Sequence, residues 1–221
     1  MSPQELAQRH PRLYHVTPRR LVASILSNGL HSSARLVEGC KLPETQACSL
    51  IEAPRKKPVA LRHPHFGPIE LGDNSPINLK ALAASLDDGL IPAQWLRLLN
   101  ERVFFWSNAR DLQRLLQSRL NRARERSVLI FDTHKLAEAY GAQMEISPIN
   151  SGAANRRVAR RGYATFAPLL ETAYATWRRA RKKRSPDRIV EIAVRASIAP
   201  IEPYLVSVEH FGAGTDGRPF S

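Results

Sequence analysis

The chain has 221 residues, of which 43% are hydrophobic and 24% charged, a balance that is ordinary for a globular protein with one sizeable core. Its apolar runs, such as residues 128–131, are far too short to cross a bilayer, so we expect no membrane association. The polar N-terminus and the presence of only two cysteines, Cys40 and Cys48, predict a cytoplasmic protein. The formal net charge of +13 points to a polyanionic partner.

A histidine lies where a predicted strand, residues 13–17, is followed by a predicted helix, residues 18–28. The helix signals are Thr17 as its cap, Pro18 as its first residue and Gly29 as the left-handed residue that ends it. This arrangement brings His15 beside the free N–H groups of a helix N-terminus, which can bind the phosphates or ribose of a nucleotide. The alternative is that such a histidine is purely structural.

Residues 30–77 lack periodicity and contain six prolines, so we expect an irregular insertion at about 31–77 within one domain over residues 1–211. The elements predicted after it are helices at 78–86 and 91–99, a strand at 103–106, a helix from Ala109 capped by Asn108, a strand at 127–132, a helix at 133–140, a strand at 144–149, a loop at 150–155, a helix from Leu169 to about Arg181, and strands at 189–195 and 204–208. The tail at 212–221 is predicted to be flexible. This order predicts an α+β domain with a bent sheet and helices loaded on one side.

The common cofactor and metal motifs are missing from the sequence. It has no Gly-rich dinucleotide fingerprint, no phosphate-binding loop ending in Gly-Lys-Ser/Thr and no Gly-x-Ser-x-Gly elbow. Cys40, Cys48, His63 and His65 have the types of metal ligands, but their spacings are not those of a zinc finger. We therefore predict no metal site.

Basic residues are concentrated in one segment, residues 151–195, which holds twelve of them against three acidic residues, a net charge of +9. Clustered arginine and lysine are typical of contacts to nucleic-acid phosphates. The alternative is a solvated basic surface and helix end, because cations also suit a helix C-terminus. The candidate nucleic-acid contacts are Arg156, Arg157, Arg160, Arg161, Arg178, Arg179, Arg181, Lys182, Lys183 and Arg184.

A single carboxylate, Glu191, interrupts the apolar strand at 189–195. Alternation places it on one face with Ile189 and Ala193. A charge at such a position is costly to bury unless it is paired or faces a cleft. Two interpretations therefore stay open: a plain salt bridge, or a working carboxylate with a shifted pKa.

With His15, an aromatic strand and Glu191 in this order, the chain resembles the DarT-like ADP-ribosyltransferases, which transfer ADP-ribose from NAD to bases of single-stranded DNA. It resembles more closely, over almost its whole length, a bacterial family of unknown function in the same superfamily. The segments that carry the resemblance are residues 13–17 with 28–30, 61–64, 90–92, 102–107, 147–152 and 190–194. The resemblance implies a split sheet flanked by helices.

The resemblance also implies NAD as co-substrate and a role for each matching residue. His15 would contact a ribose hydroxyl with Thr17 beside it, Phe105 or Trp106 would stack on the nicotinamide, and Glu191 would hydrogen-bond the nicotinamide ribose. A carboxylate at that ribose stabilises the positive charge that develops as nicotinamide leaves. The candidate phosphate contacts are Arg62, Arg157 and Arg161.

The chain departs from the family pattern at two points, of which the first removes a phenolic hydroxyl and the second narrows the range of possible acceptors. The aromatic strand reads Phe-Phe-Trp where many of these transferases have tyrosine, and position 189 is isoleucine instead of the Gln or Glu that presents a protein acceptor. Modification of a protein arginine is therefore disfavoured, which leaves nucleic-acid bases, small molecules or no transfer.

The leading hypothesis is an ADP-ribosyltransferase of DNA or RNA. The resemblance implies a toxin or defence effector with an antitoxin or an ADP-ribose-removing enzyme as partner. The alternatives are a non-catalytic nucleotide- or nucleic-acid-binding module and, third, an RNA 2′-phosphotransferase-like enzyme. No oligomeric state is predicted.

Overall fold

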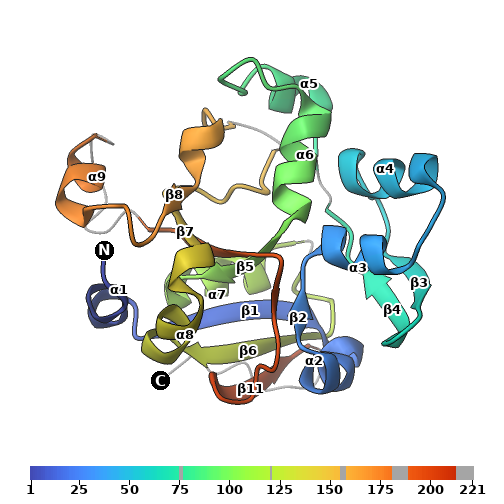
Figure 1. Cartoon of the computed structure of the whole chain (residues 1–221), viewed down its shortest axis with the longest axis horizontal. Helices are drawn as coiled ribbons and strands as arrows, with labels where there is room; N and C mark the ends of the chain where they lie inside the picture. The colour runs from blue at the N-terminus through green and yellow to red at the C-terminus, as the bar shows by residue number, and fades with distance from the viewer. Residues whose placement is uncertain (75–76, 120, 155–157, 181–188, 213–221) are drawn as a thin grey trace.

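Antiparallel pairing joins seven strands into one sheet with the order β11-β6-β1-β5-β9-β7-β8 (Figure 1). The computed structural model describes residues 1–221 apart from 75–76, 120, 155–157, 181–188 and 213–221. The strands of the large sheet are β1 (Arg12–Pro18), β5 (Arg102–Trp106), β6 (Arg126–Asp132), β7 (Met144–Ser147), β8 (Ala167–Pro168), β9 (Glu191–Arg195) and β11 (Leu205–Phe211). Two small sheets pair β2 (Leu30–His31) with β10 (Ser197–Ile198) and β3 (Val59–His63) with β4 (Gly67–Leu71).

Nine α-helices occur in the described part of the chain, and with the sheet they form a single α+β domain, as predicted. They are α1 (Pro3–Arg9), α2 (Val22–Asn28), α3 (Ser33–Gly39), α4 (Glu44–Glu52), α5 (Leu79–Ala83), α6 (Pro92–Asn100), α7 (Ala109–Gln117), α8 (Thr133–Tyr140) and α9 (Tyr174–Ala180). Side-chain caps fix several starts. Asn108 accepts the N–H of Asp111 at 2.8 Å to begin α7, as the sequence predicts.

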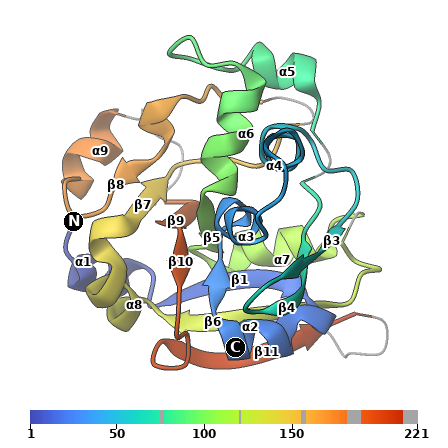
Figure 2. The ribbon, with the colours of Figure 1, turned by 45° about the vertical axis from the view of Figure 1, so that its right-hand side comes forward.

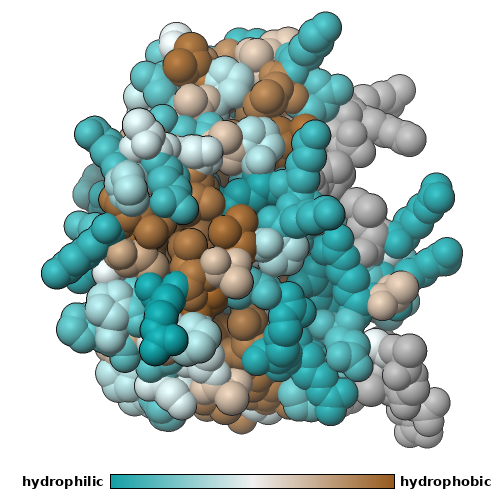
Figure 3. Space-filling view, turned by 90° about the vertical axis from the view of Figure 1, so that its right-hand side faces the viewer, coloured by the Kyte–Doolittle hydropathy of each residue, from teal (hydrophilic) through white to brown (hydrophobic). Residues whose placement is uncertain are grey.

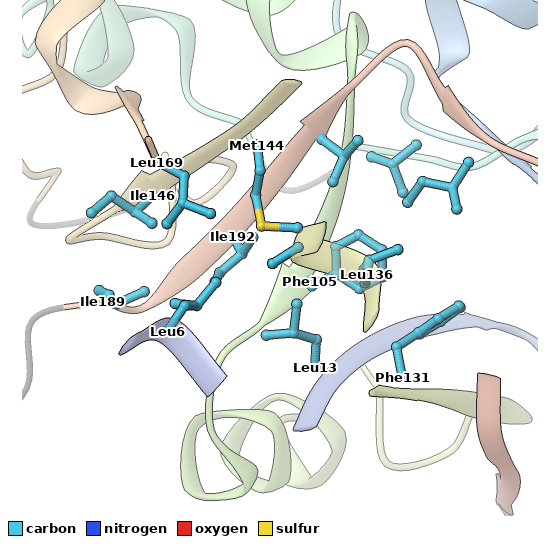
Figure 4. Packing of buried hydrophobic residues seen from close by; sticks show 14 of the residues in the cluster. Leu6, Leu13, Phe105, Phe131, Leu136, Met144, Ile146, Leu169, Ile189 and Ile192 are labelled. Carbon is cyan, nitrogen blue, oxygen red and sulfur yellow. The ribbon is translucent and has the colours of Figure 1, made fainter. Parts of the chain in front are cut away.

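The main core lies between the sheet and helices α1, α8 and α9. Phe105 of β5 and Phe131 of β6 meet edge to face in it, with their ring centroids 5.3 Å apart. Further members, labelled in Figure 4, are Leu6, Leu13, Leu136, Met144, Ile146, Leu169, Ile189 and Ile192.

The opposite face of the sheet is covered as well, so the expectation that helices load on one side is wrong. Helices α5 and α6 pack on Phe104 and Ala193, and α7 packs on Val128 and Ile130. Side chains of a strand alternate between faces, and β5 and β6 carry apolar residues at successive positions, so both faces need cover.

The large sheet divides between β1 and β5. β1 pairs with β6 at seven positions and β5 pairs with β9 at five, but β1 and β5 are in register only at Tyr14 and Trp106. The strands β11-β6-β1 therefore form one half and β5-β9-β7-β8 the other, joined at a single point. The sheet is therefore split, as the resemblance implies. The candidate site lies where β1 and β5 diverge, next to the Tyr14–Trp106 pair.

The expected irregular insertion at 31–77 is instead ordered into α3, α4 and the β3–β4 hairpin, which lie next to α6 (Figure 2). These elements have a core of their own, centred on Val37, Ile51 and Leu71. The elements are only five to nine residues long and prolines lie at their ends, as Pro43 does at the start of α4, so no periodic pattern develops.

Two predicted helix starts are also wrong. Pro18 still pairs with Arg126 in the sheet, so β1 runs through it, a 3₁₀ turn follows at Arg19–Leu21, and α2 begins only at Val22. Thr17 is consequently buried in the strand and caps nothing. The predicted end is confirmed, because Gly29 has a φ of 92°.

In the C-terminal part, α9 begins at Tyr174, because residues 169–172 turn and bind the N-terminal ammonium of Met1 through the carbonyl of Leu169 at 2.9 Å.

No helix in the described ranges is long and apolar enough to cross a membrane. The tail predicted to be flexible lies outside the described residues from 213 onward.

Candidate functional site

A cleft of about 1070 Å³ opens where β1 and β5 diverge. Its volume is slightly above the range of about 300–1,000 Å³ that is typical of small-molecule sites. Elements on its rim include α2, α3 and β4, and the face that carries them has apolar residues gathered along its middle with hydrophilic residues on either side (Figure 3). Five predicted site residues line the cleft: His15, Thr17, Phe105, Trp106 and Glu191.

Glu191 is the first residue of β9 and is only 6% exposed. Its Oε2 accepts two hydrogen bonds from Ser151, one from the backbone N–H at 2.9 Å and one from the hydroxyl at 2.6 Å. Burial raises its pKa to about 7, although the Ser151 hydrogen bonds and the positive charge of Arg161 act in the opposite direction. Of the two earlier interpretations, the structure matches the carboxylate with a shifted pKa beside a cleft.

The loop after β7 holds Ser151 against Glu191. Arg161, which is 2% exposed, braces this loop by donating to the carbonyls of Ser151 at 2.7 Å and Ala153 at 3.1 Å. Asn150 and Gly152 to Ala154 line the cleft. Sequence reasoning marked 147–152 only as a matching segment and assigned Ser151 no role. A small hydroxyl residue in a loop that the resemblance singles out was the available signal.

His15 occupies the β1 side of the cleft and is half-buried. Its Nδ1 lies 2.9 Å from the carbonyl oxygen of Phe104, and a carbonyl can only accept, so Nδ1 carries the proton. Burial lowers the pKa of the ring, and the bond to Phe104 only partly opposes this. The neutral ring therefore keeps Nε2, at its opposite edge, as a hydrogen-bond acceptor for a ligand.

The two aromatic candidates differ in their placement. Phe105 is 1% exposed and packs on His15 and Phe131, so it is mainly a core residue at the base of the cleft. Trp106 is half-buried and lies directly opposite Glu191 in the β5–β9 register, on the same face of the sheet. Trp106 is thus the better placed of the two to stack on a ring held near Glu191.

The predicted cationic residues do not gather at this cleft. Arg62 is exposed on β3, because Leu61 and His63 take the inward positions of that strand, and it is not a lining residue. Arg160 is exposed and ion-paired with Asp87. The assignment of Arg161 to a nucleic-acid surface is wrong, because this side chain is buried against backbone carbonyls.

Helix α9 carries two further candidates, Arg178 and Arg179, both exposed. Figures 1 and 2 place α9 on the opposite side of the molecule from α2 and β4, away from the cleft rim. The remaining candidates lie outside the described residues: Arg156, Arg157, Arg181, Lys182, Lys183 and Arg184.

Within the described ranges, no group of three or more potential ligands could hold a metal ion. The nearest sequence candidate, His63, is buried and uses its Nδ1 to accept the backbone N–H groups of His65 and Phe66, each at 3.2 Å. This bonding closes the β3–β4 turn, so His63 has a structural role.

The chain belongs to a family of unknown function, DUF7002, whose model matches residues 11–205. The match includes β1, β5, β9 and the loop that carries Ser151, and thus every residue of the cleft described above. A comparison of the sequence with curated proteins finds no match.

Proposed function

We propose that this protein is an NAD-dependent ADP-ribosyltransferase that modifies a nucleic acid. The observation that carries the proposal is the convergence of His15, Trp106 and Glu191 in one cleft, from three strands that meet where the sheet divides. These are the positions that the resemblance to DarT-like transferases implies for NAD. The net charge of +13 supports a polyanionic acceptor.

The residues present fit the co-substrate chemically. Neutral His15 offers Nε2 to a ribose hydroxyl, and the indole of Trp106 offers a face for the nicotinamide ring. NAD supplies a glycosidic bond that breaks as nicotinamide leaves with the bonding electrons, while a base nitrogen or oxygen of the acceptor bonds to the ribose carbon and loses a proton. Ionised Glu191, held by Ser151, stabilises the positive charge on that ribose.

The pKa of Glu191, about 7, sets the pH dependence of this chemistry. Only the ionised carboxylate stabilises positive charge, so transferase activity should rise with pH between about 6 and 8.

The test is to incubate the wild type and Glu191→Gln with adenylate-labelled NAD and separate pools of single-stranded DNA, RNA and protein. Gln keeps the shape and the acceptor oxygen for Ser151 but carries no charge, so we expect a loss of labelling of about 100-fold or more. Glu171→Gln, an exposed position outside the cleft, is the matched control. Absence of label in every pool, with all proteins folded, would overturn the proposal.

One observation favours a second function, a non-catalytic nucleotide- or nucleic-acid-binding module. The carboxyl of Glu191 is buried and hydrogen-bonded to Ser151, as a purely structural carboxyl also is. Such a module would bind NAD or an oligonucleotide equally well in the wild type and in Glu191→Gln, and neither protein would transfer label.

A further inference from the structure

Basic side chains surround one stretch of the cleft, beyond the end of β1. Those that line it are Arg20, Lys56, Lys57, Arg124 and Arg126. Two of them are paired with carboxylates, because Arg20 binds Glu70 at 2.6 Å and Arg124 binds Asp73 at 3.3 Å. Among the described residues, Lys56, Lys57 and Arg126 form no ion pair with a carboxylate.

Two hydrogen bonds and an ion pair bring these three cations to the same part of the cleft. Arg55 and Asn74 bond reciprocally, at 2.6 Å and 3.1 Å, so the turn that carries Lys56 and Lys57 lies beside residues 72–74. The ion pair of Asp73 with Arg124 ties this region to the start of β6, where Arg126 stands.

Arg126 has hydrogen-bonding capacity that the protein does not use. Its Nη2 donates to Asn121 at 3.3 Å, but its buried Nε has no partner among the described residues. Burial and the neighbouring charges of Arg124 and Arg20 lower its pKa, against the attraction of Asp73 and Glu70. A half-buried guanidinium in this state is costly until an anion accepts its hydrogen bonds, and its planar fork matches two oxygens of a phosphate.

The sheet relates Arg126 to Glu191. Arg126 and Ile130 share a face of the sheet because they are an even number of residues apart on β6. Ile130 pairs with Tyr14, Tyr14 pairs with Trp106, and Trp106 pairs with Glu191. Residues that pair directly share a face, so Arg126 and Glu191 lie on the same face of the sheet. Along β1, the partner of Arg126 is Pro18, four residues from Tyr14, a rise of about 13 Å. A ligand that reaches both residues must be extended.

We infer that Arg126, Lys56 and Lys57 form a phosphate-binding subsite of the cleft, separate from the reacting end at Glu191. The phosphate belongs either to a dinucleotide or to a single-stranded nucleic acid, since both are extended and carry the same chemistry. Phosphate binding itself does not depend on the proposed function; only the identification of its owner as co-substrate or acceptor rests on that function.

The test compares the cleft variants Lys56→Gln/Lys57→Gln and Arg126→Gln with Arg178→Gln/Arg179→Gln. The last pair removes the same charge as the lysine pair from exposed positions on α9, outside the cleft. Inorganic pyrophosphate is the probe, titrated calorimetrically at low salt. We expect each cleft variant to weaken its binding by about fivefold or more, and the α9 variant by less than about twofold. The lysine pair is exposed, so it decides the question even if Arg126→Gln fails to fold.

Titration of NAD and of a single-stranded oligodeoxynucleotide then identifies the source of the phosphate. Weaker NAD binding in the cleft variants assigns it to the dinucleotide, whereas weaker oligonucleotide binding with a shallower salt dependence assigns it to the nucleic acid. The inference is overturned if the wild type does not bind pyrophosphate, or if the cleft and α9 variants bind it equally. Glu191→Gln should bind pyrophosphate normally, so failure of the transferase proposal is distinguishable from failure of this one.

Discussion

Glu191 makes the stability of the protein depend on pH. Its pKa in the folded state is about 7, against 4.5 for an unperturbed glutamate, so between these pH values the folded state binds more protons than the unfolded state. The contribution of Glu191 to the free energy of unfolding is therefore fully present below its unfolded-state pKa and is lost as the pH rises through about 7. The upward shift of the pKa corresponds to a loss of about 3 kcal/mol in the free energy of unfolding at high pH. Glu191 thus combines a stability cost with a position in the lining of the cleft.

The first prediction concerns this cost. Glu191→Gln removes the ionisation but keeps an acceptor for Ser151, so the variant should be more stable than the wild type at pH 8, by up to about 3 kcal/mol. At pH 5 the advantage should largely disappear. Urea unfolding at the two pH values measures it, with exposed Glu171→Gln as control. If the free energy of unfolding depended on pH identically in the wild type and in Glu191→Gln, this would contradict a buried Glu191 carboxyl with a raised pKa.

Ser151→Ala is expected to shift the titration of Glu191 upward. The variant loses the hydroxyl bond of 2.6 Å, one of the interactions that lower this pKa, and keeps the backbone bond. At pH 7 less of the carboxyl is then ionised, so the proposed transferase activity should fall about two- to fivefold and recover at higher pH. A pH profile of activity and carbon NMR of the labelled carboxyl both report the change.

Ser147→Ala is the matched control for that experiment. Ser147 is the last residue of β7 and lies opposite Glu191 in the β7–β9 register, but its hydroxyl bonds to the carbonyl of Ile149 and not to Glu191. Equal upward shifts in the two serine variants would mean that the loop as a whole, and not the Ser151 hydroxyl, sets the pKa.

Local signals explain which elements could be predicted from the sequence. Asn108 before α7 and the continuous apolar run of β6 depend on neighbouring residues only, and both predictions are confirmed. Elements between residues 30 and 77 were missed because each is short and stable only through its packing on the others, as Val37 and Leu71 show. Arg161 was misassigned because burial is a tertiary property that composition does not reveal.

Arg161 is expected to be essential for the order of the loop that carries Ser151. It donates to three carbonyls, those of Ser151, Ala153 and Ala159, and a lysine cannot reproduce this planar arrangement. Arg161→Lys should lower the free energy of unfolding by about 2–3 kcal/mol. Its neighbour Arg160 is the control, since it is exposed and Arg160→Lys should change stability by less than about 0.5 kcal/mol. Chemical denaturation measures both, and similar losses would contradict the bracing role.

The connection from α2 to β2 depends on a glycine for two reasons. Gly29 has a φ of +92°, and a Cβ there would lie 2.6 Å from both the Cβ of Ala199 and the carbonyl oxygen of Ile198. Gly89 shares the positive φ, at +70°, but a Cβ there meets nothing within 4 Å. Gly89→Ala should therefore cost about 1 kcal/mol from backbone strain alone, and Gly29→Ala about 3 kcal/mol or more. Thermal unfolding of the pair separates the clash from the strain; equal losses would show that the contact relaxes freely.

The cleft itself could not be predicted from any single segment, because it is created by the way two half-sheets meet. β1 and β5 each have ordinary strand patterns, and nothing in either shows that they pair only at Tyr14 and Trp106. The resemblance supplied His15, Trp106 and Glu191, whose matching positions depend on chain order. It gave no role to Ser151 or Arg126, because their roles come from contacts across the fold.

A ligand that fills the cleft must touch both half-sheets, and this has a consequence for hydrogen exchange. The hydrogen bonds of the sheet already protect the strand amides from exchange. A change on ligand binding is therefore expected in two less protected segments, the 3₁₀ turn after β1 and the loop at 150–154. Saturating NAD should slow exchange in both, because each borders the cleft. Helices α1 and α8, which pack together away from the lining, should be unchanged.

Mass-spectrometric detection of exchange resolves these segments in one experiment. Protection on both sides would mean that NAD bridges the division of the sheet, with its reacting end at Glu191 and its far end near the start of β6. Protection of one side only, or of α1 and α8 alone, would contradict that placement. His15 and Glu191 lie in different half-sheets, so a ligand confined to one half-sheet cannot contact both residues.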